Sequence, residues 1–488
     1  MKRNSRLLAG SALFTAVAMS AAVAVAQPAY SSLSAAGGAA SSVTAAPSAT
    51  SPTSAGSTTV LSPVIESGRD SAGHTGQGAY DPVRALNRAA YPIWSTEATG
   101  SLRDLRPLHR MVGDASVVGI GEPAHNSREF FTLRDRIFRS LAAKKGFTTF
   151  GHETSWSTGV SLDRYITTGV GNPREIMRRE FQGSYLWNVR EYLEQIEWMR
   201  EYNKLHATKL RLMGDDIGYV GPEVLDRVTG FVGKTRPALL PQVTDLYAGI
   251  RSTAEYNAWF NDYLNKPLTE RVRLETATRE VMTTVASLPH STEQTWALQH
   301  ARAAWQVAKL YSYDFSAGVP SEALLFRDQM MAENVAWWNR VTGGKIVVGA
   351  HNGHIAYETA DPARYPKTQG AFLREQLGKR YVTIGLSFDR GSFNAIDIED
   401  PTAPIRTFTI GSAPAGNNEH TLDQVRYDDY VVDLRTLPRQ TKQWLTVERP
   451  TRDIGNVYPS PDLPIALGKS YDLLIHLDTV TAADRLDD

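Results

Sequence analysis

Short apolar runs, each followed by a polar loop, recur along the central part of the chain. The runs are rich in β-branched residues and lie between turn residues, which is typical of buried strands in a parallel sheet. Apolar residues at helical spacing lie between several of these runs, so strand and helix alternate. The predicted strands are Val117–Ile120, Gly146–Gly151, Leu210–Gly214, Lys345–Gly349 and Tyr381–Leu386. This alternation predicts an α/β fold with a central, mostly parallel sheet flanked by helices.

The helix predicted after the first strand carries an arginine inside its apolar face. Asn126 or Ser127 can cap the start of this helix. Arg134 lies four residues after Phe130 and three before Ile137, both of which belong to the apolar stripe. An arginine in this position either meets a buried carboxylate or extends from the edge of the stripe into water.

The stretch from 221 to 342 shows helical patterns alone. A crossover of this length is more than one packing helix between parallel strands needs. We therefore expect an inserted helical subdomain at 221–342, between a first part (81–220) and a second part (343–488) of an α/β domain. The insertion either covers a functional site or forms a bundle without a catalytic part. Near the end of the chain, we expect the run from Tyr471 to Leu477 to form the far edge of the sheet, with antiparallel strands added.

The start of the chain differs from the rest. Positively charged residues precede an apolar stretch that ends in Ala-Val-Ala at positions 24–26. This is typical of a cleaved signal peptide at residues 1–26, with an uncleaved membrane anchor as the alternative. Residues 27–80 are mainly Ser, Ala, Gly, Thr and Pro, and they cannot bury enough apolar surface to offset the entropy of ordering. We expect a secreted, extracellular protein with a disordered linker and no membrane contact after cleavage.

Composition narrows the chemistry. Lys and Arg number 52, as do Asp and Glu, so no net charge favours a nucleic acid or an anionic membrane as partner. The chain has no cysteine, which excludes disulfides, thiolate metal ligands and a cysteine nucleophile. Neither a G-x-S-x-G turn nor a Gly-rich phosphate loop accompanies the predicted strands. Histidine, carboxylate and arginine remain as candidate catalytic groups for a small-molecule substrate.

Titratable residues follow four of the predicted strands in succession. They are Glu122 and His125, Glu153, Asp215 and Asp216, and His351 and His354. In an open α/β sheet, ligands bind just beyond the carboxyl ends of the strands. We therefore expect these side chains to share one crevice, although a single residue of this kind is also common as a helix cap or an ion-pair partner.

One mechanism for this set is general-base hydrolysis. His125 would remove a proton from water, and the water would attack an ester carbonyl. Glu122 or Glu153 would orient the ring or the water. The oxyanion would be stabilised by one of three groups, His351, His354 or Arg134.

The other mechanism is metal-dependent hydrolysis. The His351-x-x-His354 spacing, together with His125 and a carboxylate, could hold a zinc ion with water in the open position. Spacing alone does not separate these two mechanisms.

Several segments together resemble the erythromycin esterase family. They are Gly121–His125 with Glu129, Phe130 and Arg134, Gly151–Glu153 with Trp156 and Asp163–Tyr165, Tyr185–Asn188, Gly214–Asp216, Ala350–His354, and Tyr471–Ile475 with Thr479. The resemblance implies the fold of the erythromycin esterase and ChaN-like superfamily, with a central α/β sheet and an inserted helical bundle. It also implies hydrolysis of a macrolide lactone, an antibiotic-resistance activity, without a metal or other cofactor. A different bulky ester is the alternative substrate.

The resemblance also assigns roles to residues of this chain. His125 matches the general base, and the other catalytic positions are Glu122, Arg134, Glu153, His351 and His354. The residues expected to contact the substrate are Trp156, Tyr185, Trp187 and Asp215. Which of His351 and His354 points into the crevice is left open, with His354 favoured. Because the superfamily includes metal-dependent and haem-binding members, the alternatives are a metal-dependent hydrolase and a haem- or ligand-binding protein.

Overall fold

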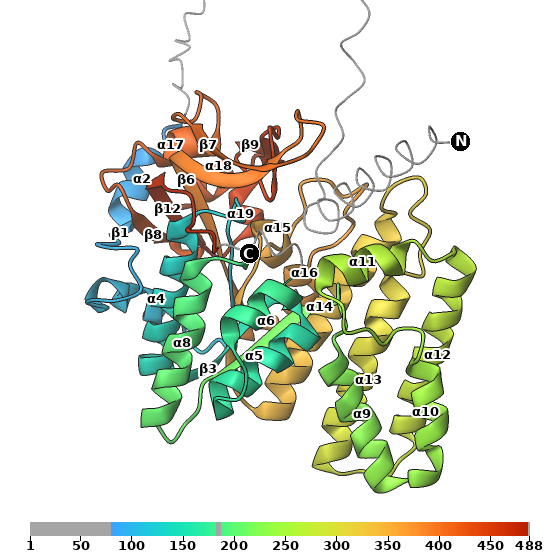
Figure 1. The fold of residues 1–488 in the computed structure, drawn as a ribbon. Coiled ribbons are helices and arrows are strands. Elements are labelled where there is room, and N and C mark those ends of the chain that lie inside the picture. Colours follow the sequence, from blue (N-terminus) through green and yellow to red (C-terminus); the bar gives the residue numbers. More distant parts are fainter. Residues whose placement is uncertain (1–79, 182–186, 487–488) are drawn as a thin grey trace, which may run out of the picture. The chain divides into compact units, whose positions relative to one another are not determined.

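The computed structural model describes residues 80–181 and 187–486, so the predicted signal peptide, nearly all of the predicted linker and Tyr185 lie outside it. A mixed ten-stranded sheet, mostly parallel, forms its centre (Figure 1). The strand order is β1-β8-β12-β6-β2-β5-β3-β4, and β7 and β10 pair with β6 beside this path. The strands are β1 Tyr91–Pro92, β2 Val117–Ile120, β3 Phe147–Ser155, β4 Arg211–Asp216, β5 Lys345–Gly349, β6 Tyr381–Asp397, β7 Ile405–Ile410, β8 Tyr430–Asp433, β10 Val457–Tyr458 and β12 Leu473–Val480, with β9 Arg449–Thr451 and β11 Leu463–Ile465 as a separate pair.

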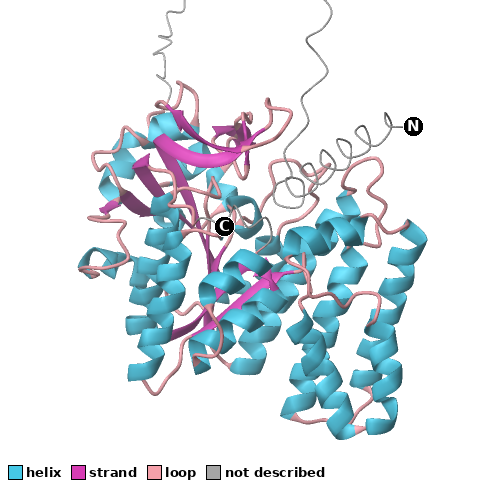
Figure 2. Ribbon diagram, in the orientation of Figure 1, coloured by secondary structure: helices cyan, strands magenta, loops and turns pink. Residues whose placement is uncertain are grey.

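Helices flank the sheet, which confirms the predicted α/β class (Figure 2). The α-helices are α2 Val83–Ala89, α3 Arg106–Val112, α4 Arg128–Lys145, α5 Trp156–Thr168, α6 Pro173–Glu180, α8 Arg190–Leu205, α9 Pro222–Thr235, α10 Leu240–Tyr247, α11 Tyr256–Leu264, α12 Leu268–Ala286, α13 Thr292–Leu310, α14 Ser321–Thr342, α15 Asn352–Ile355, α16 Gln369–Leu377, α17 Asn418–Leu422, α18 Arg439–Leu445 and α19 Leu467–Ser470. Short 3₁₀ helices lie at Arg103–Leu105, Pro237–Leu239, Gly378–Arg380 and Leu434–Thr436.

Alternate residues of the central strands enter two separate apolar cores. Val117 of β2 and Val348 of β5 belong to one core, together with side chains from α9 to α14. Val118 of β2 and Val347 of β5 belong to the other, together with side chains from α4 and α8. Since successive residues of a strand point to opposite faces, these cores lie on the two faces of the sheet. Both faces are therefore covered, which is why β2 and β5 are continuous apolar runs.

All five strands predicted from the apolar runs are present, and three of them run further than predicted. β3 continues to Ser155, so Glu153 lies within the strand rather than beyond it. β4 continues to Asp216, so Asp215 and Asp216 also lie within their strand, and β6 continues to Asp397. The predicted antiparallel additions are present, but the prediction that the last strand is itself the edge of the sheet is wrong. β12 lies between β6, which is parallel to it, and β8, which is antiparallel. The physical reason is that β8 pairs with β12 and β1 pairs with β8, each in antiparallel orientation. β12 therefore has a neighbouring strand on both of its edges, and its residues are mostly buried.

Helices α9 to α14 connect β4 to β5 and span the range predicted to be helical. Figure 1 shows α9, α10, α12 and α13 side by side as a bundle, and α14 runs back against β4 and β5. None of the helices in the described part of the chain combines the length and apolar character that crossing a membrane requires.

Candidate active site

One asparagine ties the loop after β2 to the loop after β5. Asn352 accepts a hydrogen bond from the backbone N–H of Leu386 at 3.1 Å and donates one to the Leu386 carbonyl at 2.8 Å. Its own backbone N–H donates to the carbonyl of Glu122 at 2.9 Å. A Cβ on Gly121 would lie 2.0 Å from Oδ1 of Asn352, so this approach requires glycine there. The two histidine-bearing loops are therefore held next to each other.

A carboxylate holds one side of the His125 ring. Nδ1 of His125 lies 2.9 Å from Oε1 of Glu122. Because a carboxylate oxygen only accepts, Nδ1 carries a proton, and in the neutral form of the ring the lone pair is on Nε2. Both side chains are fully buried, and Nε2 has no hydrogen-bond partner among the described residues. Nε2 is therefore the atom of His125 that is placed to take a proton.

Arg134 of α4 fixes the other oxygen of this carboxylate. Its Nη2 lies 2.6 Å from Oε2 of Glu122 and donates to the hydroxyl of Tyr192 at 2.7 Å. Only 1% of the Arg134 side chain is exposed. The prediction that this arginine either meets a carboxylate or extends into water is resolved in favour of the carboxylate.

His351 lies against His125, with ring centroids 4.9 Å apart. Its Nδ1 accepts a hydrogen bond from the backbone N–H of Gly353 at 3.1 Å, so the proton of the neutral ring is on Nε2. Burial, and then the neighbouring His125, hold the pKa of His351 well below its usual value. Nε2 lies 3.2 Å from Oδ1 of Asp453. His351 is thus a neutral N–H donor beside the His125 ring.

Glu153 links the β5 loop to the helical insertion. One of its oxygens accepts the backbone N–H of His351 at 2.8 Å, and the other accepts from Nη2 of Arg327 at 3.3 Å. Arg327 also donates to both oxygens of Asp216, at 2.9 and 2.7 Å. Burial opposes ionisation of Glu153, but the charge of His354 above all, with Arg327, outweighs burial and holds its pKa well below the usual value.

Both ring nitrogens of His354 are occupied. Nδ1 lies 2.6 Å from Oδ1 of Asp328, and Nε2 lies 3.4 Å from Oε1 of Glu153 as well as 3.0 Å from Nη1 of Arg327. Burial would lower the pKa of His354, but Asp328 and then Glu153 outweigh it and raise the pKa to about 10. His354 is therefore a fixed cation at neutral pH. The sequence favoured His354 as the histidine that points into the crevice, whereas the structure places His351 against His125.

Two of the predicted substrate-binding tryptophans lie in different surroundings. Trp187 meets His125 edge-on, with ring centroids 4.8 Å apart. Trp156 instead packs against the helical insertion, and its Nε1 donates to Nδ1 of His300 at 3.1 Å. Trp156 also lines a cavity of about 300 Å³, whose described lining includes His300 but none of the three loop histidines. Trp187, rather than Trp156, is the tryptophan next to the His125 ring.

The other two predicted substrate-binding residues are Asp215 and Tyr185. Asp215 is fully buried and accepts a hydrogen bond from Nε2 of Gln369 at 2.7 Å. Burial raises the pKa of Asp215 well above its usual value. Tyr185 lies outside the described residues. The substrate contacts of both remain predictions.

The sequence interpretation missed three buried members of this cluster, Arg327, Asp328 and Asp453. A signal for the first exists, because Arg327 lies three residues after Leu324 and four before Met331, within an apolar stripe. The same spacing had singled out Arg134. Asp453 has no such signal, since it lies in a loop between two short strands.

The zinc alternative does not fit the ring contacts of the histidines. An imidazole nitrogen must present a lone pair to bind a metal. In His354, one nitrogen faces a carboxylate and the other faces the Arg327 guanidinium, which would repel a metal ion. In His351, Nδ1 is occupied by the Gly353 N–H and Nε2 carries the proton. No catalytic step is therefore derived through a metal.

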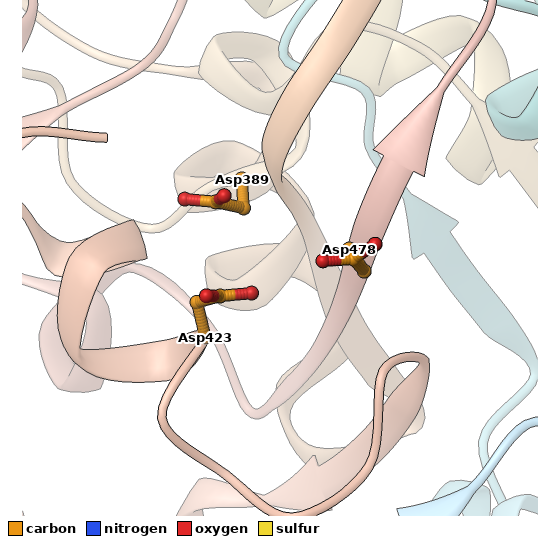
Figure 3. A group of neighbouring side chains, drawn as sticks. All are labelled: Asp389, Asp423 and Asp478. Carbon is orange, nitrogen blue, oxygen red and sulfur yellow. The ribbon is translucent and has the colours of Figure 1, made fainter. Parts of the chain in front are cut away.

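A group of three carboxylates away from the three loop histidines has the atom types that bind metal ions. Across the described ranges, one group of three such residues has ligand atoms within 4.8 Å of one another: Asp389, Asp423 and Asp478. Figure 3 shows these carboxylates, which come from β6, the end of α17 and β12. Arg390 already pairs with two of them, at 3.3 Å to Asp389 and 2.8 Å to Asp478. The chain thus supplies its own cation to this group.

The fold and the site together define an α/β protein with a helical insertion and a buried histidine–carboxylate centre suited to acid–base chemistry. A family model described as erythromycin esterase matches residues 142–480. This chain belongs to the erythromycin esterase family. The matched range includes Glu153, His351 and His354, whereas Glu122 and His125 precede it.

Individual relatives agree with this assignment. Erythromycin esterase type II of Escherichia coli is 25% identical over 361 residues, which are 69% of this chain and 84% of the relative. A crystal structure of a Bacillus cereus protein has a TM-score of 0.76 and 29% identity, and the match covers 84% of this chain and 100% of that one. An erythromycin esterase variant in an open conformation shares the fold, with a TM-score of 0.62, 16% identity and coverage of 80% and 97%. Family membership indicates a hydrolase of the esterase type.

Proposed function

We propose that this protein hydrolyses a bulky or cyclic ester, with a macrolide lactone as the first substrate to test, and that His125 is the general base. The observation that carries this proposal is the state of the His125 ring. Nδ1 is held by Glu122, while Nε2 has no hydrogen-bond partner within the described part of the chain. A neutral imidazole held in this way can take a proton from water at Nε2.

The surrounding groups supply the rest of the reaction. As Nε2 of His125 removes a proton, the water oxygen attacks the ester carbonyl, and the Glu122 carboxylate stabilises the imidazolium through Nδ1. Nε2–H of His351 is a donor for the oxyanion that forms on the carbonyl. Arg134 holds Glu122 in place from α4. This mechanism uses protein side chains and water alone.

Aromatic side chains favour a bulky, apolar substrate. Trp187 contacts both His125 and His152, and the His152 ring stacks on Phe181 with centroids 5.3 Å apart. Burial lowers the pKa of His152 to about 3, so this ring is neutral and belongs to a buried, largely apolar cluster next to His125. A macrolide or another bulky ester that reaches His125 would bury apolar surface against this cluster. The E. coli relative, named an erythromycin esterase, supports the same choice.

Export is a separate part of the proposal. It rests on the basic start, the apolar stretch and the Ala-Val-Ala sequence at residues 24–26. An exported esterase of this kind would meet its substrate outside the cytoplasm.

Mass spectrometry tests the proposed reaction. Purified protein is incubated with erythromycin and with a panel of other lactones and bulky esters, in water enriched in ¹⁸O. The expected product has gained one water, with the heavy oxygen in the new carboxylate. Turnover of other esters but not of macrolides would support the esterase activity and refute the macrolide as its substrate. Failure to add water to any member of the panel would refute the proposed function.

A further inference from the structure

We propose that Asp453 is a second catalytic residue, a general acid that protonates the leaving oxygen as the ester bond breaks. The proposal rests on the ester hydrolysis proposed above. Hydrolysis of an alkyl ester or a lactone must expel an alkoxide, which is a poor leaving group unless it receives a proton. Asp453 is placed to give that proton.

The loop that carries Asp453 is tied to the loop that carries His125. Asp453 lies between β9 and β10. The next two residues, Ile454 and Gly455, both donate their backbone N–H groups to the carbonyl of Pro123, at 2.6 and 3.0 Å. In return, the backbone N–H of His125 donates to the carbonyl of Gly455 at 2.9 Å. These bonds fix the position of Asp453 relative to the general base.

The side chain of Asp453 reaches the same histidine that flanks His125. It is 5% exposed, and its Oδ1 lies 3.2 Å from Nε2 of His351. The His351 ring in turn lies 4.9 Å from the His125 ring, centroid to centroid. His351 therefore lies close both to the general base and to the Asp453 carboxyl. In a substrate whose carbonyl oxygen accepts from His351, the oxygen of the attacking water and the leaving oxygen of the ester would lie near His125 and Asp453.

The charge balance of the site favours a protonated Asp453. Three cations, Arg134, Arg327 and the protonated His354, are paired with four carboxylates, Glu122, Glu153, Asp216 and Asp328. Carboxylates thus already outnumber cations in a buried site, so a further negative charge would be costly. The His351 ring, which lies 3.2 Å from Oδ1 of Asp453, is neutral and adds no positive charge.

Burial acts in the same direction. It raises the pKa of Asp453 to about 8, against a smaller opposing effect of His354. The carboxyl group therefore carries a proton at neutral pH. His351 does not compete for this proton, because its own pKa lies well below the usual value.

The proposed steps balance. Water gives one proton to Nε2 of His125 as its oxygen bonds to the carbonyl carbon. The tetrahedral intermediate then collapses, the bond from carbon to the leaving oxygen breaks, and the Asp453 carboxyl gives its proton to that oxygen. The products are a carboxylic acid and an alcohol. The proton on His125 finally returns to the Asp453 carboxylate, which restores both groups.

The test compares leaving groups in wild type and Asp453→Asn. The substrates are ethyl, phenyl and 4-nitrophenyl esters of butyric acid, or of a longer acid that the wild type accepts. A nitrophenolate leaves without a proton, whereas an ethoxide does not. We expect Asp453→Asn to lower kcat/KM for the ethyl ester by about 10²- to 10⁴-fold and for the nitrophenyl ester by less than about threefold. The control is Asp433→Asn, another buried aspartate, on β8, and it should affect no member of the series.

Several outcomes would overturn the proposal. Asp453→Asn could keep the wild-type melting temperature and lose the same factor in kcat/KM for all three esters. That result would show that Asp453 does not donate a proton to the leaving group. Retained activity on the ethyl ester would show no role. If the variant does not fold, kcat/KM of the wild type is compared across the three esters. A general acid makes kcat/KM nearly independent of the leaving group, so a steep dependence contradicts the proposal. A wild type that hydrolyses neither esters nor lactones refutes the proposed function, and the inference falls with it.

Discussion

The ion pair between Glu122 and Arg134 should support His125, and removing either partner alone should strongly destabilise the protein. Its atoms lie 2.6 Å apart, and the two side chains are 0% and 1% exposed. Arg134→Met would leave the Glu122 carboxylate buried without its guanidinium, and Glu122→Gln would leave the Arg134 charge buried without its carboxylate. Removal of one partner from a buried pair costs about 3–5 kcal/mol of unfolding free energy.

The double variant separates the charge effect from other effects. With both charges gone, neither is stranded, so Glu122→Gln/Arg134→Met should lose less stability than the two single variants summed, by at least about 2 kcal/mol. Chemical denaturation of the four proteins measures this difference. Additivity of the single effects within about 0.5 kcal/mol would refute the reasoning, since independent sites behave that way. Glu122→Gln should also lower kcat by about 10²- to 10⁴-fold, because the His125 ring loses the group that fixes its proton on Nδ1.

Four further predictions concern other parts of the account. The pKa of His354 rises from 6.5 to about 10 on folding, so the stability from its charge is complete below about pH 6.5 and is lost as the pH rises through about 10. The unfolding free energy should therefore fall less steeply between pH 7 and 10 in His354→Gln than in wild type, and parallel curves would contradict this assignment. Arg327→Met should lower the unfolding free energy by about 3–5 kcal/mol, because Glu153 and Asp216 lose a buried partner. The control Arg128→Met, which removes an exposed pair with Glu97, should lower it by less than about 1 kcal/mol. Equal losses in the two variants would argue against the buried network. Dialysis against a chelator should leave ester turnover unchanged, and a loss restored by zinc would reinstate the metal mechanism. N-terminal sequencing of the exported protein should begin at Gln27, while a retained apolar stretch would indicate an anchor.

The local pattern of apolar and polar residues was sufficient to predict the strands that carry the site. The apolar runs predicted five strands because both faces of this sheet are covered, and such strands show no alternation with polar residues. Arg134 was identified from helical spacing, but the cost of burying a charge left two alternatives, a carboxylate partner or extension into water, and the contact with Glu122 decides between them. The placement rule for parallel strands brought the residues at the carboxyl ends of β2, β3, β4 and β5 to one edge, and these strands are neighbours in the sheet.

Long-range packing was not accessible from the same patterns. Arg327 and Asp328 reach the site because α14 runs back against the sheet, which depends on the path of the whole helical insertion. Asp453 reaches it through a loop that pairs with Pro123, some 330 residues earlier in the chain. His351 is the N-cap of the single-turn helix α15 and has non-helical backbone angles, whereas His354 lies within the helix, so their orientations depend on this cap and not on the spacing alone. The position of β12 depends on antiparallel additions that the apolar run itself does not show.

The most direct test of the central claim is kcat/KM of His125→Asn on an ester or lactone that the wild type hydrolyses. The matched control is His476→Asn, which alters another fully buried histidine whose Nδ1 lies 2.9 Å from the Ser387 hydroxyl on β6. We predict that His125→Asn lowers kcat/KM by about 10²- to 10⁴-fold at an unchanged melting temperature, while His476→Asn keeps the wild-type value. A folded His125→Asn variant with wild-type kcat/KM would contradict the assignment of His125 as the general base.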